Sequence, residues 1–171
     1  MIRKFLLLSA TVAAFSARAA NGVSLELGYG DEDSHLVRAG VQWTWGEKRP
    51  LGKHLQWGGY WEASLGRWEN GERVTDLAVT PVFRLEKPGA GVLPYVEAGI
   101  GLHLESQIEF SDHRTSGTKF QFGDHVGFGV RFGERLRHDL GLRLQHISNG
   151  GIASPNPGMN FAILRYQYHY D

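Results

Sequence analysis

The sequence predicts an all-β protein, an eight-stranded antiparallel transmembrane β-barrel of a bacterial outer membrane. Three observations predict it: an N-terminal export signal, eight segments in which apolar side chains recur at every second residue, and no apolar run of membrane-helix length after the signal. A tilted strand needs about 9–11 residues to cross a bilayer, whereas a helix needs about 20. Most of the eight segments approach the strand length, so we expect the chain to cross the membrane with strands.

The first 19 residues have the order of parts found in a secretory signal peptide. A basic pair, Arg3 and Lys4, precedes an apolar run from Phe5 to Phe15, and Ala17-Arg18-Ala19 follows as a small-x-small cleavage site. The alternative is a buried first helix, which would not need these parts in this order. We expect cleavage after residue 19 or 20, which leaves residues 20–171 as one barrel domain.

Strict alternation of apolar and polar residues defines the eight strands. The segments are Val23–Tyr29, Val37–Trp45, Leu55–Leu65, Leu77–Leu85, Val96–Leu104, Phe120–Phe132, Leu140–Leu144 and Ala162–Tyr170. The opposite faces carry Gln42, Glu62, Arg84, Glu97, His103, Gln121, His125, Arg131, Arg143, Arg165 and Gln167. A soluble β-sandwich would alternate similarly. Uniformly apolar outer faces, an even number of strands and aromatic residues near strand ends favour a membrane barrel with a polar, packed interior.

Aromatic residues form the predicted girdle at the membrane–water interfaces. They are Trp43, Trp45, Trp57, Trp61, Trp68, Tyr166, Tyr168 and Tyr170, on the apolar face or beside it. If the mature chain starts in the periplasm, periplasmic turns fall near residues 46–54, 87–92 and 133–137. Outward loops then fall near residues 30–34, 68–74, 105–119 and 149–159.

Composition narrows the classes of function. The chain has 171 residues, 18 basic and 18 acidic residues, and no cysteine. A balanced charge argues against a nucleic-acid partner, because phosphate binding needs an excess of basic residues on one face. The lack of cysteine excludes disulfides, zinc–thiolate sites and a cysteine nucleophile.

Four polar residues interrupt apolar stripes near one end of the predicted barrel. His146 and Ser148 share the parity of Leu140, Leu142 and Leu144, and Asn160 shares that of Leu164. Asp124 is in phase with Phe122, and folding the strands about the 133–137 turn places it roughly opposite residue 146 or 147. Polar groups that face lipid are costly, which favours a functional reason. The alternative is that these strand ends already lie in interfacial water, where polar residues cost little.

Acyl transfer is the chemistry that these residues could perform. Ser148 could attack a carbonyl, His146 could accept its proton, and a third group could fix the imidazole tautomer. Side chains two residues apart on a strand start about 6–7 Å apart and can lean together. The loop of residues 149–158 supplies backbone N–H groups and amides for an oxyanion hole.

The same residues carry a resemblance to a known family. His146-Ile147-Ser148-Asn149, then Gly151 and Pro155-Asn156-x-Gly158, resembles the signature of the outer-membrane lipid A 3-O-deacylases, the PagL family. Further matching stretches cover nearly the whole mature chain: residues 58–62, 81–83, 95–101 and 122–124. The resemblance implies hydrolysis of the ester-linked 3-hydroxyacyl chain at position 3 of lipid A, on the lipid-facing surface, without a cofactor or metal.

The resemblance also implies roles for single residues. His146 matches the family's base and Ser148 its nucleophile, while Gly151 and Asn156 match oxyanion-hole positions and Asn149 follows the nucleophile. Asp124 looks like a recurrent acid of the family and is the candidate supporting acid. Asn160 stands where the family has a glutamate. The chain is therefore active with Asn160, active with Asp124 supplying the charge, or much weakened.

Other readings remain open at this point. A non-enzymatic structural or adhesive barrel explains the alternation but not the polar residues on the lipid face. An outer-membrane acyltransferase is disfavoured by the motif. A metal site is disfavoured because no two of the eight histidines lie two apart on one strand face; we expect His103 and His125 to fill the barrel interior. Lipid A or lipopolysaccharide is the expected partner, in the outer membrane, and a homodimer is among the alternatives for the oligomeric state.

Overall fold

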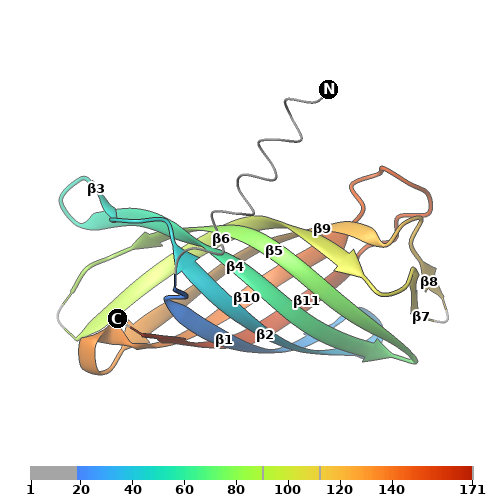
Figure 1. The fold of residues 1–171 in the computed structure, drawn as a ribbon, viewed down its shortest axis with the longest axis horizontal. Coiled ribbons are helices and arrows are strands. Elements are labelled where there is room, and N and C mark those ends of the chain that lie inside the picture. The colour runs from blue at the N-terminus through green and yellow to red at the C-terminus, as the bar shows by residue number, and fades with distance from the viewer. Residues whose placement is uncertain (1–18, 90, 112, 171) are drawn as a thin grey trace.

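Eight long strands form a closed antiparallel barrel in the computed structural model, which describes residues 19–89, 91–111 and 113–170 (Figure 1). The predicted signal peptide therefore lies outside the described residues except for Ala19. The barrel strands are β1 (Gly22–Gly30), β2 (Ser34–Thr44), β4 (Leu55–Asn70), β5 (Glu72–Glu86), β6 (Val92–Glu105), β9 (Phe120–Phe132), β10 (His138–Ser148) and β11 (Met159–His169). The predicted fold class is confirmed.

The strand order closes the sheet on itself. Hydrogen-bonded neighbours run β2-β1-β11-β10-β9-β6-β5-β4, and pairing of β2 with β4 completes the ring. The first strand, β1, thus lies beside the last, β11, with Gly30 opposite Phe161. Two further hairpins extend the ends: β3 (Arg49–Leu51) pairs with the start of β4, and β7 (Glu109–Ser111) pairs with β8 (Arg114–Thr115).

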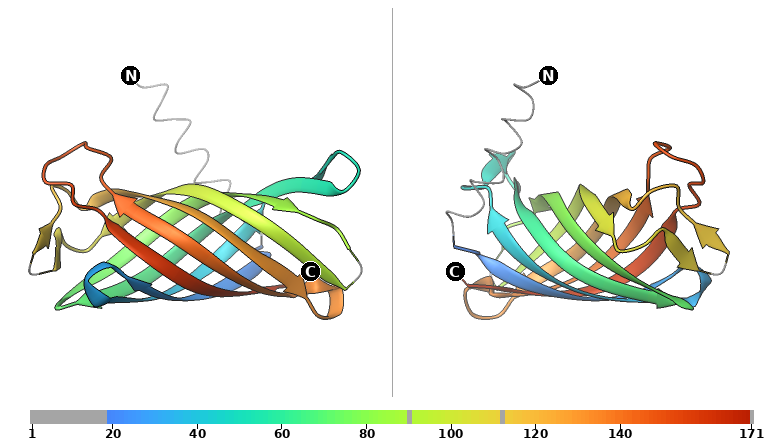
Figure 2. Two further views of the ribbon diagram at one scale, coloured as in Figure 1. Left: turned by 180° about the vertical axis from the view of Figure 1, so that it is seen from behind. Right: turned by 45° about the vertical axis from the view of Figure 1, so that its right-hand side comes forward.

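The two ends of the barrel differ. Figure 1 shows β3 at one end and β7 and β8 at the other, and Figure 2 shows the orange-red loop of residues 149–158 at the same end as β7 and β8. We call this second end the loop end; it also carries the 3-10 turns of η1 (Asp31–Asp33). A second such turn, η2 (Glu134–Leu136), connects β9 to β10 at the opposite end. Within the described residues, neither turn nor any other helix has the length and apolar character to span a membrane.

Alternation separates the two faces of every wall strand. On β10, Leu144 is 65% exposed while its neighbour Arg143 is 5% exposed. The predicted outward residues are exposed or half-buried, and almost all the predicted inward ones, His103 and His125 among them, are buried. Arg131, near the end of β9, is half-buried. The apolar exterior matches a hydrocarbon surrounding, and the polar interior is filled by side chains, as expected for a barrel of this size.

Buried ion pairs hold the interior. Arg143 contacts Glu97 at 2.6 Å, Glu26 at 2.9 Å and Glu62 at 3.1 Å. Arg38, Arg84 and Arg165 make comparable pairs with interior carboxylates. A buried charge is tolerated only when it is paired and hydrogen-bonded. This network explains why so many charged residues alternate with lipid-facing apolar ones.

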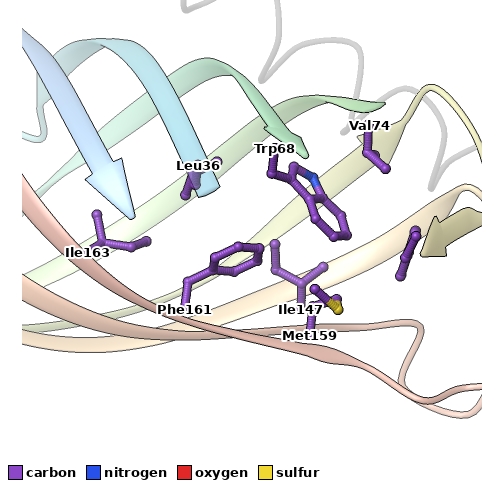
Figure 3. Packing of buried hydrophobic residues seen from close by; sticks show 8 residues of the cluster. Leu36, Trp68, Val74, Ile147, Met159, Phe161 and Ile163 are labelled. Atoms are coloured by element: carbon purple, nitrogen blue, oxygen red, sulfur yellow. The ribbon is translucent and has the colours of Figure 1, made fainter. Parts of the chain in front are cut away.

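An apolar cluster closes the interior toward the loop end. It contains Leu36, Trp68, Val74, Phe110, Ile147, Met159, Phe161 and Ile163, seven of which are labelled in Figure 3. Trp68 is 0% exposed, so its assignment to the interfacial girdle was wrong. The physical reason is phase: Trp68 shares the parity of the inward Glu62 on β4, whereas Trp57 and Trp61 have the outward parity.

The predicted connection at residues 68–74 is present but shorter than expected. Strands β4 and β5 continue past the expected ends and leave only Gly71, with φ 71°, between them. Pairing of Asn70 with Glu72 maintains the ladder to the tip. A positive φ is accessible to glycine without steric cost, which permits this tight connection.

Candidate active site

Three neighbouring strands place the predicted polar residues in one row on the outer wall. Strand pairing sets Asp124 of β9 opposite His146 of β10, and His146 opposite Asn160 of β11. Asp124 and Asn160 are exposed and His146 is half-buried, so the predicted outward parity is confirmed. Met159 is buried, as its parity predicts. The row lies near the loop end, because β10 ends two residues later at Ser148.

His146 contacts Asn160 rather than Asp124. Its Nδ1 lies 2.8 Å from Asn160 Oδ1. Asp124 is directly across the ladder, yet its carboxylate makes no hydrogen bond within the described part of the chain. Of the two residues considered for orienting the imidazole, Asn160 is the one in contact.

Gly158 packs against the imidazole ring of His146. Its φ is +66°, and a Cβ added there would lie 2.7 Å from His146 Cε1 and 3.2 Å from Nε2. Both the left-handed backbone and the close approach require a residue without a side chain. Gly158 immediately precedes β11, so the backbone that positions Asn160 also confines the ring of His146.

Ser148 is the last residue of β10. It is half-buried, pairs with Phe122, and lies on the same face as His146. In the region that the structure describes, its hydroxyl makes no side-chain hydrogen bond, so it is not committed to another partner. Side chains at this spacing can lean to hydrogen-bond distance, and such contacts often tighten only when substrate binds.

Asn149 organises the loop that follows. Its Nδ2 donates to the carbonyl oxygen of Ala153 at 2.9 Å, and its Oδ1 accepts the N–H of Gly151 at 2.9 Å. The N–H of Asn149 donates to Asn156 Oδ1 at 2.9 Å. Because an N–H needs an acceptor, this contact fixes the Asn156 amide with Oδ1 inward and Nδ2 directed away. Among the three predicted oxyanion residues, Asn156 thus retains a side-chain donor without a partner in the described residues.

A turn that sequence reasoning missed lies against Asn160. Asp31 Oδ2 accepts hydrogen bonds from Asn160 Nδ2 at 2.9 Å and from its backbone N–H at 3.1 Å. Arg114, on the β7–β8 hairpin, donates to the same oxygen at 3.0 Å and to the carbonyl oxygen of Gly158 at 2.8 Å. Burial raises the pKa of Asp31, but hydrogen bonds from Asn160 and Arg114 outweigh it and hold that pKa below its usual value.

These residues border a hollow in the outer wall. Its lining includes Tyr29, Asp31, Asp124, His146 and Asn160, together with apolar side chains of β9 to β11. Ser148 lies two residues further along β10, outside the lining. A hollow that combines carboxylates, an imidazole and exposed apolar residues suits a ligand with both a polar head and hydrocarbon.

One group of interior residues has the composition of a metal site. Asp76, His103 and Glu105 place one potential ligand atom each within 4.8 Å of one another. Asp76 is already bonded to Arg38 at 3.0 Å and to His103 at 2.8 Å. We therefore assign Asp76 and His103 to the interior polar network.

Comparisons with known proteins agree on one family. Residues 35–169 match the family model described as lipid A 3-O-deacylase (PagL). The lipid A deacylase PagL of Bordetella bronchiseptica is 38% identical over 161 residues, covering 87% of this chain and 83% of the relative. That of Pseudomonas aeruginosa is 32% identical over 155 residues, covering 89% and 87%.

Solved structures agree with the sequence comparison. The crystal structure of the outer membrane enzyme PagL superposes with a TM-score of 0.80 at 30% identity, over 86% of this chain and 99% of the other. The N-terminal barrel domain of Pseudomonas aeruginosa OprF reaches 0.50 at 16% identity, over 90% of this chain and 100% of that domain, and shares the fold alone.

Proposed function

The chain belongs to the PagL family of lipid A 3-O-deacylases, and from that premise we propose that Ser148 and His146 are the residues that cleave the ester. The protein is an outer-membrane hydrolase that releases the 3-hydroxyacyl chain at position 3 of lipid A. The contact between His146 Nδ1 and Asn160 Oδ1 carries the residue assignment, because it orients an imidazole on a lipid-facing wall. A site there meets a membrane lipid without removing it from the outer leaflet.

The tautomer of His146 follows from its partner. An amide oxygen only accepts hydrogen bonds, so Nδ1 carries the proton and Nε2 keeps its lone pair. Nε2 is therefore the general base, and Ser148, two residues along the strand on the same face, is the hydroxyl that can lean toward it.

The proposed reaction has two steps, acylation of Ser148 and hydrolysis of the acyl-serine. Ser148 Oγ bonds to the ester carbonyl carbon while its proton passes to His146 Nε2, and collapse of the tetrahedral intermediate breaks the bond to the 3-oxygen of the sugar, which takes that proton. Water then attacks the acyl-serine, loses a proton to Nε2, and releases the free 3-hydroxy fatty acid as Ser148 regains its proton. No cofactor enters either step.

Asn156 supplies a donor for the developing oxyanion. Its Nδ2 points away from the contact with Asn149, and preorganised donors of this kind are worth about 10²–10³ in rate. The N–H of Gly151 donates to Asn149 Oδ1 and serves an oxyanion only if that hydrogen bond is exchanged. All the assigned residues come from one chain, so the proposed chemistry requires no second copy.

Asn160, and not Asp124, is the residue that orients His146 in this proposal. The hydrogen bond to Asn160 supports it, and the lack of one to Asp124 among the described residues is consistent with it. Replacing the acid of a serine triad by its amide can cost on the order of 10⁴ in rate when the wrong tautomer results. In this chain the Oδ1 contact preserves the productive tautomer.

Variants of the three residues test the assignment. Ser148→Ala and His146→Asn should lower deacylation on the order of 10³-fold or more, while Asp124→Asn should stay within about threefold. Release of one hydroxyacyl chain is measured by mass spectrometry of lipid A with purified protein. Ser106→Ala, an exposed serine at the same end, is the matched control, and heat-modifiable migration confirms folding. Substantial activity in Ser148→Ala would refute the nucleophile assignment.

A further inference from the structure

Asp31 lies behind Asn160 as the next member of a hydrogen-bonded series. It begins η1, directly after β1, and the pairing of β1 with β11 brings it beside Asn160. One oxygen, Asp31 Oδ2, accepts from both the side chain and the backbone N–H of Asn160. Two hydrogen bonds from one residue to one carboxylate oxygen fix the position of that residue more tightly than either would alone.

The charge of Asp31 decides which way the Asn160 amide faces. The two ends of a carboxamide have almost the same shape, so their orientation is set by hydrogen-bond partners. An ionised carboxylate only accepts, so the NH₂ end must face Asp31. Oδ1 must then face His146, and Nδ1 of that ring must carry its proton.

We propose that Asp31 is a positioning residue for the deacylation reaction: it locks the Asn160 amide so that His146 keeps Nε2 free as the base. The inference rests on the proposed function of Ser148 and His146. It also explains how an amide can stand where a serine triad usually has an acid. The carboxylate of Asp31 lies behind the amide, and Asn160 transmits its orienting effect to His146.

Without Asp31, the amide has no reason to prefer the productive orientation. A flipped Asn160 presents NH₂ to His146 Nδ1, which must then accept, and the proton moves to Nε2. Nε2 cannot then take the proton of Ser148. The negative charge of Asp31 also polarises the amide and strengthens Oδ1 as an acceptor, because hydrogen bonds in series reinforce one another.

Contacts from the β7–β8 hairpin hold Asp31 in place. Arg114 bonds Asp31 at 3.0 Å and Glu32 at 2.6 Å, and Ser111 donates to Glu32 at 2.5 Å. Charge-assisted bonds of this kind are stronger than neutral ones. The turn is thus anchored from a separate loop, which supports a fixed position for the carboxylate.

The test compares four variants of the full-length protein in one lipid A deacylation assay. Asp31→Ala should lower kcat on the order of 10- to 100-fold with KM within about twofold, because it removes the acceptor that faces the Asn160 amide, and orientation rather than binding is lost. Asp33→Ala makes the same chemical change in the same turn without touching Asn160, and should stay within about twofold. Asn160→Asp alone should be impaired, because it places two carboxylates side by side.

The double variant Asp31→Asn with Asn160→Asp separates positioning from structural support. A carboxylate at residue 160 accepts from His146 in either orientation, and an amide at residue 31 can donate to it. We therefore expect kcat to recover to at least about half that of the unaltered protein.

Two results would overturn the inference: kcat of Asp31→Ala within twofold of the unaltered protein, or a double variant no better than Asp31→Ala. Asp31→Leu serves as the second test if Asp31→Ala does not fold. Activity in Ser148→Ala would instead refute the proposed function, so failure of the proposed function and failure of this inference are distinguishable.

Discussion

Gly158→Ala tests whether the imidazole of His146 is confined where the structure shows it. Gly158 is buried, has φ +66°, and its missing Cβ would lie 2.7 Å from His146 Cε1. Ordinary contact begins near 3.4 Å, so the ring must move by 3.4 − 2.7 = 0.7 Å to admit a methyl group. Such a movement would disturb the 2.8 Å contact between Nδ1 and Asn160 Oδ1.

Two costs follow from this geometry. A left-handed alanine costs about 1–2 kcal/mol of backbone energy, which lowers stability but not the rate of a folded molecule. Displacement of a reacting group by about 1 Å can cost on the order of 10²-fold in rate. We therefore expect kcat to fall about 10- to 100-fold, or roughly 1.4–2.7 kcal/mol at 1.36 kcal/mol per tenfold.

Gly52→Ala is the matched control. Gly52 also has φ +66°, but a Cβ there meets nothing within 4 Å, and it lies in the β3–β4 turn at the far end of the barrel. It carries the same backbone cost without touching His146. Deacylation is followed by mass spectrometry over time, and stability by the temperature of heat-modifiable migration. Equal rates for the two variants would show that the ring is not held by Gly158.

Two further predictions concern the interior and the turn. Arg143→Leu removes one ion-pair partner from each of three carboxylates and should destabilise the barrel by about 3–5 kcal/mol. Arg73→Leu removes a 71% exposed arginine from an exposed ion pair and should cost less than about 1 kcal/mol. Urea unfolding in detergent compares the two variants, and equal unfolding midpoints would contradict the interior network. Because its folded pKa is lowered, Asp31 contributes stability above its ordinary value of 3.8 and loses it only as the pH falls through the lowered value. The transition that Asp31 causes in the amide N–H resonance of Asn160 should therefore have its midpoint below 3.8; a midpoint above that value would show that the hydrogen bonds do not favour the ionised form.

Most of the fold could be predicted because the barrel interior requires polar side chains and the lipid-facing exterior requires apolar ones, at alternate residues of each strand. Once Leu144 must face lipid and Arg143 must be paired in the interior, a one-residue register slip is forbidden, and the pairing follows. The same parity predicts Asp124, His146 and Asn160 in one row on the outer wall. Trp68 was misassigned because it was grouped with the other tryptophans by residue type, although its phase on β4 pointed inward.

The turn beyond β1 could not be predicted in this way, because parity has no meaning outside a strand. Asp31 sits in η1, and its contact with Asn160 depends on the path of a three-residue connection. One signal was available: in a closed antiparallel barrel the first and last strands are neighbours, so the end of β1 meets the start of β11. When that pairing is extended past Gly30, it places residues 31 and 160 close together.

If Asn160 orients His146 as proposed, the site divides between two residues what the acid of a serine triad does alone. The acceptor on the lipid-facing wall is a neutral amide, so the row on that wall carries one carboxylate, that of Asp124, and not two. The charge lies instead on Asp31, outside the membrane-crossing strands, where Arg114 compensates it at 3.0 Å. The arrangement works only while η1 keeps Asp31 in contact with Asn160, because the Asn160 amide itself has no preference for either orientation. The rate of this enzyme should therefore depend on the β7–β8 hairpin in a way that a site with its own carboxylate on β11 would not.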